Sequence, residues 1–177
     1  EKLDSISHRL SLMFDEIHIV HRLDMATSGV MVFARNKDSL RSLQQQFQHR
    51  QTKKSYQAIV HGHLHPSTGA INLPMRCDWP NRPRQMVCYE HGKKSLTRWR
   101  VIEYIGCNTR IELIPTTGRS HQLRIHCNAM KHPILGDHLY GTTDSQTATK
   151  HLCLHAQSLT FKHPSTQLET RFTSPVP

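Results

Sequence analysis

The sequence lacks several features that would assign it to a common class of protein. No apolar run approaches the roughly 20 residues that a membrane-spanning helix needs, and no C-x-x-C pair occurs. The five cysteines are odd in number and widely spaced, which argues against a disulfide framework and against a structural zinc site. The start of the chain is charged and has no signal-peptide pattern. These absences exclude an integral membrane protein and favour the cytoplasm.

Motifs for nucleotide binding and serine hydrolysis are missing as well. The sequence contains neither G-x-G-x-x-G nor a P-loop, and the one candidate for G-x-S-x-G, at residues 118–122, reads GRSHQ. His61, His63 and His65 alternate and could share one face of a strand, but no nearby carboxylate or cysteine completes a set of metal ligands. We therefore expect neither a metal nor a cofactor.

Positive charge is what the sequence has in excess. Its 177 residues include 23 Lys and Arg against 13 Asp and Glu, which gives a net charge of +10. With 36% hydrophobic residues, the chain has enough apolar surface for the core of a single domain over residues 1–177. A strongly basic surface attracts polyanions, of which nucleic acid is the first candidate, although an ordinary basic protein would have the same charge.

Hydrophobic patterning predicts many strands and few helices. Strands are expected over residues 16–20, 30–34 and 55–60, in a hairpin over 97–104 and 110–114, and around 152–154. Helices are expected after Asn36, which can cap the first turn, and from about Arg119 to Met130. Residues 76–84, rich in Pro and Arg, indicate an ordered loop. This pattern favours an α+β domain built on a mixed, mostly antiparallel sheet, flanked by helices and loops.

Two segments could carry chemistry, but each has a simpler interpretation. In HRLDMATSG, residues 21–29, Arg22 and Asp24 would point to the same side of a strand and place a carboxylate at its end. Asp24 could instead cap the turn and pair with Arg22, and this segment alone favours that role. In TGRSHQLRIH, residues 117–126, a helix that begins at a glycine turn could bind phosphate, or it could be a basic surface helix.

Taken together, three segments resemble the RluA family of pseudouridine synthases. They are HRLDMATSG, KKSYQAIVHG from Lys53, and TGRSHQLRIH from Thr117; HPILGDHLYG from His132 and LHA from Leu154 extend the match. The segment CDWPNRPRQMVCYEHGK from Cys77 resembles the members that act on both 23S ribosomal RNA and tRNA. The resemblance implies a pseudouridine synthase catalytic fold and a cofactor-free isomerisation of uridine. The family's usual N-terminal strand has no match, so residues 1–19 are expected to be atypical or truncated.

The resemblance also implies roles for particular residues. Asp24 corresponds to the catalytic carboxylate, and Arg124 to an arginine that forms a salt bridge with it. Tyr56 corresponds to a tyrosine that can stack on the uracil ring, although a core tyrosine would occupy the same strand face. Arg22 corresponds to a residue that helps to hold the flipped-out base, with simple pairing to Asp24 as the alternative.

RNA is the expected partner, in the form of a stem-loop of 23S rRNA or of a tRNA anticodon arm, and the protein is expected to be monomeric and not bound to membranes. Further substrate-binding residues are expected at Arg76, Arg82, Arg84, Arg119 and His121. A catalytically impaired RNA-binding fragment of the same fold is the main alternative. A metal-dependent RNA hydrolase that uses the three alternating histidines is a weaker one.

Overall fold

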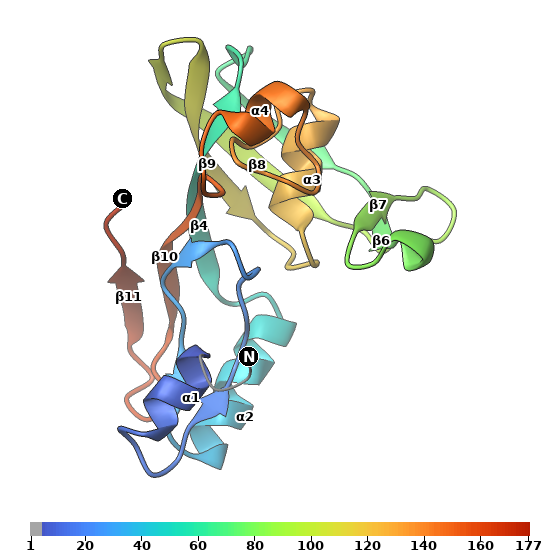
Figure 1. Ribbon diagram of the computed structural model, residues 1–177. Helices are drawn as coiled ribbons and strands as arrows, with labels where there is room; N and C mark the ends of the chain where they lie inside the picture. Colours follow the sequence, from blue (N-terminus) through green and yellow to red (C-terminus); the bar gives the residue numbers. More distant parts are fainter. Residues whose placement is uncertain (1–4) are drawn as a thin grey trace.

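One mixed sheet runs through most of the protein in a computed structural model that describes residues 5–177. Residues 1–4, part of the N-terminal segment that was expected to be atypical or truncated, lie outside this description. Six strands of the sheet follow the order β11-β10-β4-β9-β8-β5, and β2 pairs with β10 off this path (Figure 1). The strands are β2 (Ser28–Gly29), β4 (Lys53–His61), β5 (Thr68–Asn72), β8 (Leu96–Ile105), β9 (Asn108–Pro115), β10 (Leu154–Lys162) and β11 (Glu169–Thr173).

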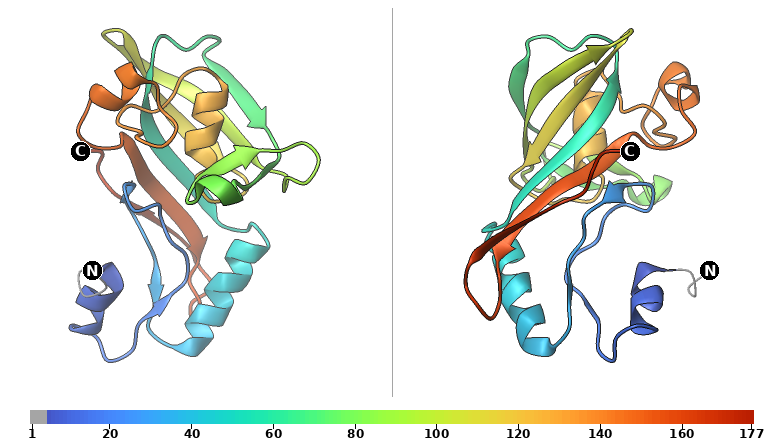
Figure 2. Two further views of the ribbon diagram at one scale, coloured as in Figure 1. Left: turned by 45° about the vertical axis from the view of Figure 1, so that its right-hand side comes forward. Right: turned by 90° about the vertical axis from the view of Figure 1, so that its left-hand side faces the viewer.

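The sheet connects two parts of the molecule, each with its own buried cluster. In one part, α3 (Gln122–Ala129) packs against β4, β8 and β9, and α4 (Thr143–Thr147) lies beside it (Figure 2). In the other, α2 (Lys37–Gln48) lies beside β10, whereas α1 (Ile6–Ser11) stands apart from the sheet. Representative buried residues are Val60, Ile111, Leu113, Leu123 and Ile134 in the first cluster and Ala34, Leu43, Leu159 and Phe161 in the second.

Several expected elements are confirmed, and their physical causes are visible. Asn36 caps α2, since its Oδ1 accepts a hydrogen bond from the amide of Ser39 at 2.8 Å. Strand β4 alternates as predicted, with Ala58 and Val60 buried on one face. The hairpin β8–β9 and a sheet that is antiparallel apart from the β2–β10 pair also agree with the sequence analysis.

Other elements differ from the prediction. The expected strands at 16–20 and 30–34 shrink to β1 (His18–Ile19) and β3 (Phe33–Ala34), because they pair only with each other, outside the main sheet. Helix α3 begins at Gln122 and not at Arg119, because His121 adopts a left-handed conformation with φ of 54°. Strand β11 has no counterpart in the prediction. His63 and His65 lie beyond the end of β4, so the three alternating histidines do not share a strand face.

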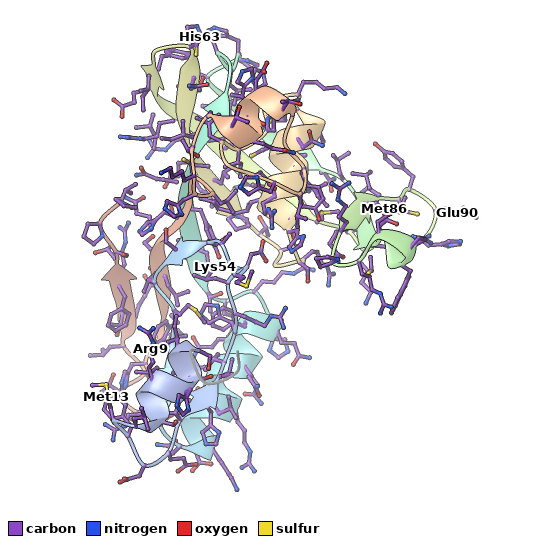
Figure 3. All side chains as sticks on the ribbon, in the orientation of Figure 1. Arg9, Met13, Lys54, His63, Met86 and Glu90 are labelled. Carbon is purple, nitrogen blue, oxygen red and sulfur yellow. The ribbon has the colours of Figure 1, made fainter. Side chains whose placement is uncertain are left out.

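Residues 75–87 form a small hairpin, although its central part, residues 76–84, was expected to be an ordered loop. Strands β6 (Met75–Cys77) and β7 (Gln85–Val87) pair antiparallel around a short 3₁₀ helix, η2 (Trp79–Asn81). The hairpin projects from the body of the protein, with Met86 on it and Glu90 just beyond (Figures 1 and 3). Within residues 5–177, no helix has the length and apolar character required to cross a bilayer.

Candidate active site

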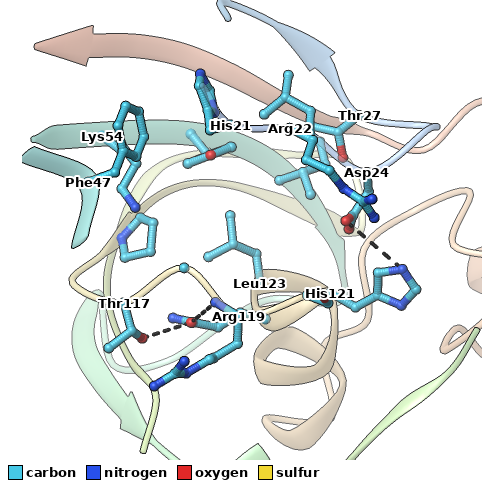
Figure 4. Close-up of a pocket in the computed structure, with 17 residues that line it drawn as sticks. His21, Arg22, Asp24, Thr27, Phe47, Lys54, Thr117, Arg119, His121 and Leu123 are labelled. Carbon is cyan, nitrogen blue, oxygen red and sulfur yellow. Dashed lines mark hydrogen bonds and ion pairs between the residues drawn. The ribbon is translucent and has the colours of Figure 1, made fainter. Parts of the chain in front are cut away.

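A cavity of about 330 Å³ lies where the two parts of the molecule meet (Figure 4). One wall is residues 21–24 with Thr27, which follow β1. The opposite wall is the segment 117–123, which connects β9 to α3 and leads directly into Arg124. Between the two walls, β4 contributes Lys54 and Tyr56. The cavity therefore brings together the three segments on which the family resemblance depends.

Asp24 lies in the first wall, with its side chain one quarter exposed. A turn holds its backbone, since the amide of Thr27 donates to the Asp24 carbonyl at 2.8 Å. Two basic side chains from the opposite wall approach its carboxylate: Arg124 Nη1 lies 3.8 Å from Oδ2, and His121 Nε2 lies 4.0 Å from Oδ1. The carboxylate thus faces the cavity with an arginine and an imidazole nearby but without a short hydrogen bond to either of them.

The expected ion pair between Arg124 and Asp24 is present, but the closest partner of Arg124 is Asp137. Arg124 donates to Asp137 from Nε at 2.9 Å and from Nη2 at 2.6 Å, in a bidentate pair that is almost completely buried. Asp137 Oδ1 also accepts from the amides of Leu139 and Tyr140. Burial lowers the pKa of Arg124, but Asp137 and Asp24 outweigh that effect and raise it. Arg124 is therefore a fixed cation beside Asp24.

A buried hydrogen-bond network fixes the wall that contains Arg119. Gln122, 3% exposed, accepts through Oε1 from the Thr117 hydroxyl at 2.7 Å and from the Arg119 amide at 3.0 Å. Its Nε2 donates to Thr97 Oγ1 and to the Leu96 carbonyl, both in β8. The segment 117–119 is thus attached to the central sheet through one amide side chain.

His121 connects the cavity to the projecting hairpin. Its Nδ1 lies 2.6 Å from the hydroxyl of Tyr140, which accepts a hydrogen bond from the amide of Gln85 at 2.8 Å. Burial lowers the pKa of His121, although the Asp24 carboxylate opposes this shift. The side chain that faces Asp24 is consequently held by a group that also holds β7.

Tyr56, on β4, lines the cavity and is partly buried. Burial and, to a smaller extent, the Asp24 charge raise its pKa to about 12. The phenol is therefore protonated at neutral pH and can offer a ring face and a hydroxyl donor, but it is a poor base.

The remaining predicted residues fall into two groups. Arg22 and Arg119 line the cavity with exposed side chains, whereas the other three arginines lie on or next to the hairpin, outside the cavity: Arg76, Arg82 and Arg84. Arg82 lies over the exposed ring of Trp79, 4.7 Å from its centroid.

Four residues of the site were missed by sequence reasoning: Asp137, Tyr140, Lys54 and His21. The first two lie in HPILGDHLYG and the last two in KKSYQAIVHG and HRLDMATSG. All three segments belong to the resemblance to the RluA family. A signal was therefore available, but nothing in the sequence assigned chemistry to these four positions.

Comparison with known proteins gives consistent results. The family model described as RNA pseudouridylate synthase matches residues 3–129. The chain is 48% identical over 176 residues to the dual-specificity RNA pseudouridine synthase RluA of Escherichia coli, covering 99% of this chain and 80% of that protein. It is 51% identical over 169 residues to the protein of that name from Vibrio vulnificus, covering 93% and 68%. The solved structure of human RNA Pseudouridylate Synthase Domain Containing 1 superposes with a TM-score of 0.85 at 31% identity, covering 98% of this chain and 74% of that one.

Proposed function

Since this chain belongs to the RNA pseudouridylate synthase family and is an RNA-modifying isomerase, we propose that Asp24 is its catalytic carboxylate and that its substrates are stem-loops of 23S rRNA and tRNA. The observation that carries this proposal is the position of Asp24, which faces a cavity lined by Tyr56 and is opposed by Arg124 and His121. The dual specificity in the names of the bacterial relatives supports the two classes of RNA.

The proposed reaction moves the uracil ring without adding or removing atoms overall. The bond between ribose C1′ and uracil N1 breaks, a bond between C1′ and C5 forms, C5 loses its proton and N1 gains one. A carboxylate can begin this by attack at the sugar or by removal of a sugar proton, and both routes require it to be ionised. Arg124 places a fixed positive charge 3.8 Å from the Asp24 carboxylate, on the side opposite the first wall.

Tyr56 acts as a platform for the uracil and not as the base that removes the C5 proton. Its phenol is protonated, and its ring lies in the same cavity as Asp24. An aromatic face can stack on a base that has rotated out of the RNA. The exposed Arg22 guanidinium, two residues before Asp24 in the chain, helps to hold the flipped-out base through stacking and phosphate contacts.

The basic hairpin provides the wider RNA contact. Arg76, Arg82 and Arg84 are exposed on or beside a projecting element, and the exposed Trp79 ring offers a stacking surface. In the cavity wall, Arg119 and His121 supply further contacts to the same RNA. We propose that the chain acts as one catalytic domain, as a monomer and in the cytoplasm. One sheet runs through both parts of the molecule, and all five cysteines are free, as in a reducing compartment.

The experiment that tests the function is tritium release from RNA labelled at uridine C5, in the presence of a chelator. We expect the wild type to release tritium from a tRNA anticodon stem-loop and from a 23S rRNA hairpin, and Asp24→Asn to lose at least about 1,000-fold in kcat with little change in RNA affinity. The exposed Asp38 of α2, changed in the same way, is the matched control and retains full activity.

Two results would contradict the proposal. Turnover by Asp24→Asn close to that of the wild type would remove Asp24 from the chemistry. Tight, salt-sensitive RNA binding by the wild type without tritium release from either RNA would identify a binding protein that has kept the fold.

A further inference from the structure

The end of the cavity away from Asp24 contains a second group of functional side chains. Lys54, on β4, lies beside Phe47 of α2 and His21 of the first wall, at the opposite end of the cavity from Asp24 (Figure 4). Its Nζ is 6.0 Å from the centroid of the Phe47 ring, and a side-chain Cβ placed at Gly118 would be only 3.4 Å from Nζ. The ammonium group therefore approaches the opposite wall of the cavity.

Lys54 has no negative partner in the structure of residues 5–177. The adjacent Lys53, on the other face of the same strand, shows the contrast, because it forms an exposed ion pair with Glu169 at 3.0 Å. Burial without such a partner lowers the pKa of Lys54. A half-buried ammonium that faces a cavity and has no counter-ion is costly to maintain, and an anion entering the cavity would remove that cost.

His21 adds a neutral hydrogen-bond donor to this end of the cavity. Its Nε2 accepts from the amide of Val32 at 3.2 Å, so in the neutral ring the proton lies on Nδ1. Burial and the charge of Lys54 lower the pKa of His21 to about 4, which keeps the ring neutral at pH 7. Stacking on Phe47, with centroids 4.7 Å apart, fixes the ring plane. His21 thus contributes a donor without a second full charge.

We propose that Lys54 and His21 form a subsite for one phosphodiester of the RNA strand next to the target uridine. The proposal rests on the function proposed above and extends it. Lys54 and Tyr56 are two residues apart on one strand face, about 7 Å along β4, a separation comparable with the length of one nucleotide. A uracil stacked on Tyr56 therefore places a neighbouring phosphate within reach of Lys54.

A phosphate explains this end of the cavity better than a uracil carbonyl does. A carbonyl oxygen would satisfy a hydrogen bond but would leave the ammonium charge without a counter-ion. The cavity is lined by Lys54, Arg22 and Arg119, and Asp24 is the single carboxylate among the lining residues. A net positive lining matches a strand with one negative charge per nucleotide.

The test combines one substitution with neutral phosphates in the RNA. Binding of an anticodon stem-loop is measured against salt concentration for the wild type, Lys54→Met, Lys54→Arg and the matched control Lys53→Met. Each phosphate of the loop is then replaced in turn by an uncharged methylphosphonate, and the affinities of the wild type and Lys54→Met are compared for each RNA. Thermal unfolding of every variant establishes that it is folded.

We expect Lys54→Met to bind about tenfold more weakly and to reduce the slope of log K against log salt by roughly 1, while Lys54→Arg and Lys53→Met keep the wild-type slope. One methylphosphonate beside the modified uridine should weaken the wild type by a similar factor and leave Lys54→Met unaffected. If Lys54→Met is unstable, Lys54→Gln, which removes the charge but keeps a polar end, takes its place in the same comparison.

Three results would overturn the subsite. In the first, Lys54→Met has the salt slope of Lys53→Met. In the second, no loop phosphate couples to Lys54. In the third, the wild type and Lys54→Met still differ in affinity for every RNA that carries a methylphosphonate, but they no longer differ when the target base is removed. That result would mean that Lys54 contacts the base and not a phosphate. Failure of the proposed function is seen separately, as RNA binding without tritium release, because every readout of the subsite is an affinity.

Discussion

The two walls that meet at Asp24 are built in opposite ways. The wall that leads into Arg124 is held from behind by buried side chains, since Gln122 connects it to β8 and Asp137 connects Arg124 to the turn before α4. The wall that contains Asp24 is partly exposed, and β2, two residues long, attaches it to the sheet. Arg124 is thus fixed before RNA arrives, whereas the carboxylate lies at the open side.

This contrast indicates how the site combines stability with access. A buried arginine needs a full set of partners, and Asp137 supplies them, so the charge of Arg124 acts on Asp24 without depending on it. The proposed reaction requires that Asp24 reach a sugar, and the partly exposed wall that carries it leaves that side open. Three predictions examine the contrast, in order of decreasing effect.

The largest effect is expected from Asp137→Asn, which breaks the buried wall. The change leaves Arg124 with an uncompensated buried charge, which costs about 3–5 kcal/mol of unfolding free energy. We also expect at least about 100-fold loss of kcat, because Arg124 no longer keeps its position beside Asp24. Urea unfolding and tritium release measure the two effects.

The same substitution at Asp144, exposed in the first turn of α4, is the control, and it should cost less than about 1 kcal/mol. Equal effects at positions 137 and 144 would contradict the special role of the buried pair.

A smaller effect is expected from Gly29→Ala, which disturbs the attachment of the open wall. Gly29 has φ of +114°, and a Cβ there would lie 2.3 Å from the carbonyl oxygen of Ala156 in β10. Backbone strain and displacement of β2 should cost about 2–3 kcal/mol and lower kcat. Gly106→Ala serves as the control: φ is also positive, but no atom lies within 4 Å, so only about 1 kcal/mol is expected. Equal losses at the two glycines would mean that the contact with β10 is unimportant.

The third prediction concerns the pH dependence of the buried wall. His126 is fully buried between Ser95 and Thr97, and burial lowers its pKa from 6.5 to about 4. Between these values the unfolded chain binds the extra proton, so stability must fall as the pH decreases from about 7 to 4. Between pH 7 and pH 5 this histidine should account for about 2 kcal/mol of that loss.

His126→Gln should therefore show a shallower loss of unfolding free energy over this pH range than the wild type, measured by urea denaturation. His49→Gln, at the exposed end of α2, serves as the matched control and should follow the wild-type curve. Parallel curves for the wild type and His126→Gln would contradict the prediction.

Elements that depend on local pattern could be predicted from the sequence. The Asn36 cap, the alternation of β4 and the β8–β9 hairpin each follow from neighbouring residues. Strand β2 could not be predicted in this way, because a two-residue strand owes its existence to β10, more than 120 residues away in the chain. Strand β11 likewise depends on its pairing with β10.

The same distinction applies to the site. The resemblance placed Asp24, Tyr56 and His121 in segments that the fold does bring into one cavity. Asp137 remained unassigned because its importance comes from a bidentate pair with Arg124, which only the packing of α3 against the following turn creates. The separate positions of Lys53 and Lys54 follow from strand alternation, but the absence of a counter-ion for Lys54 is a property of the folded surroundings.

The hydrogen-bonded connection between the hairpin and His121, through Tyr140, affects how the RNA preference of such proteins can change during evolution. The donor that the hairpin gives to the Tyr140 hydroxyl is the backbone amide of Gln85, and every residue except proline has one. Substitutions of hairpin side chains can therefore change which RNA the hairpin prefers. The connection to the wall that contains His121 is preserved. RNA recognition by the hairpin can therefore change without loss of the hydrogen bond between the backbone amide at position 85 and the Tyr140 hydroxyl.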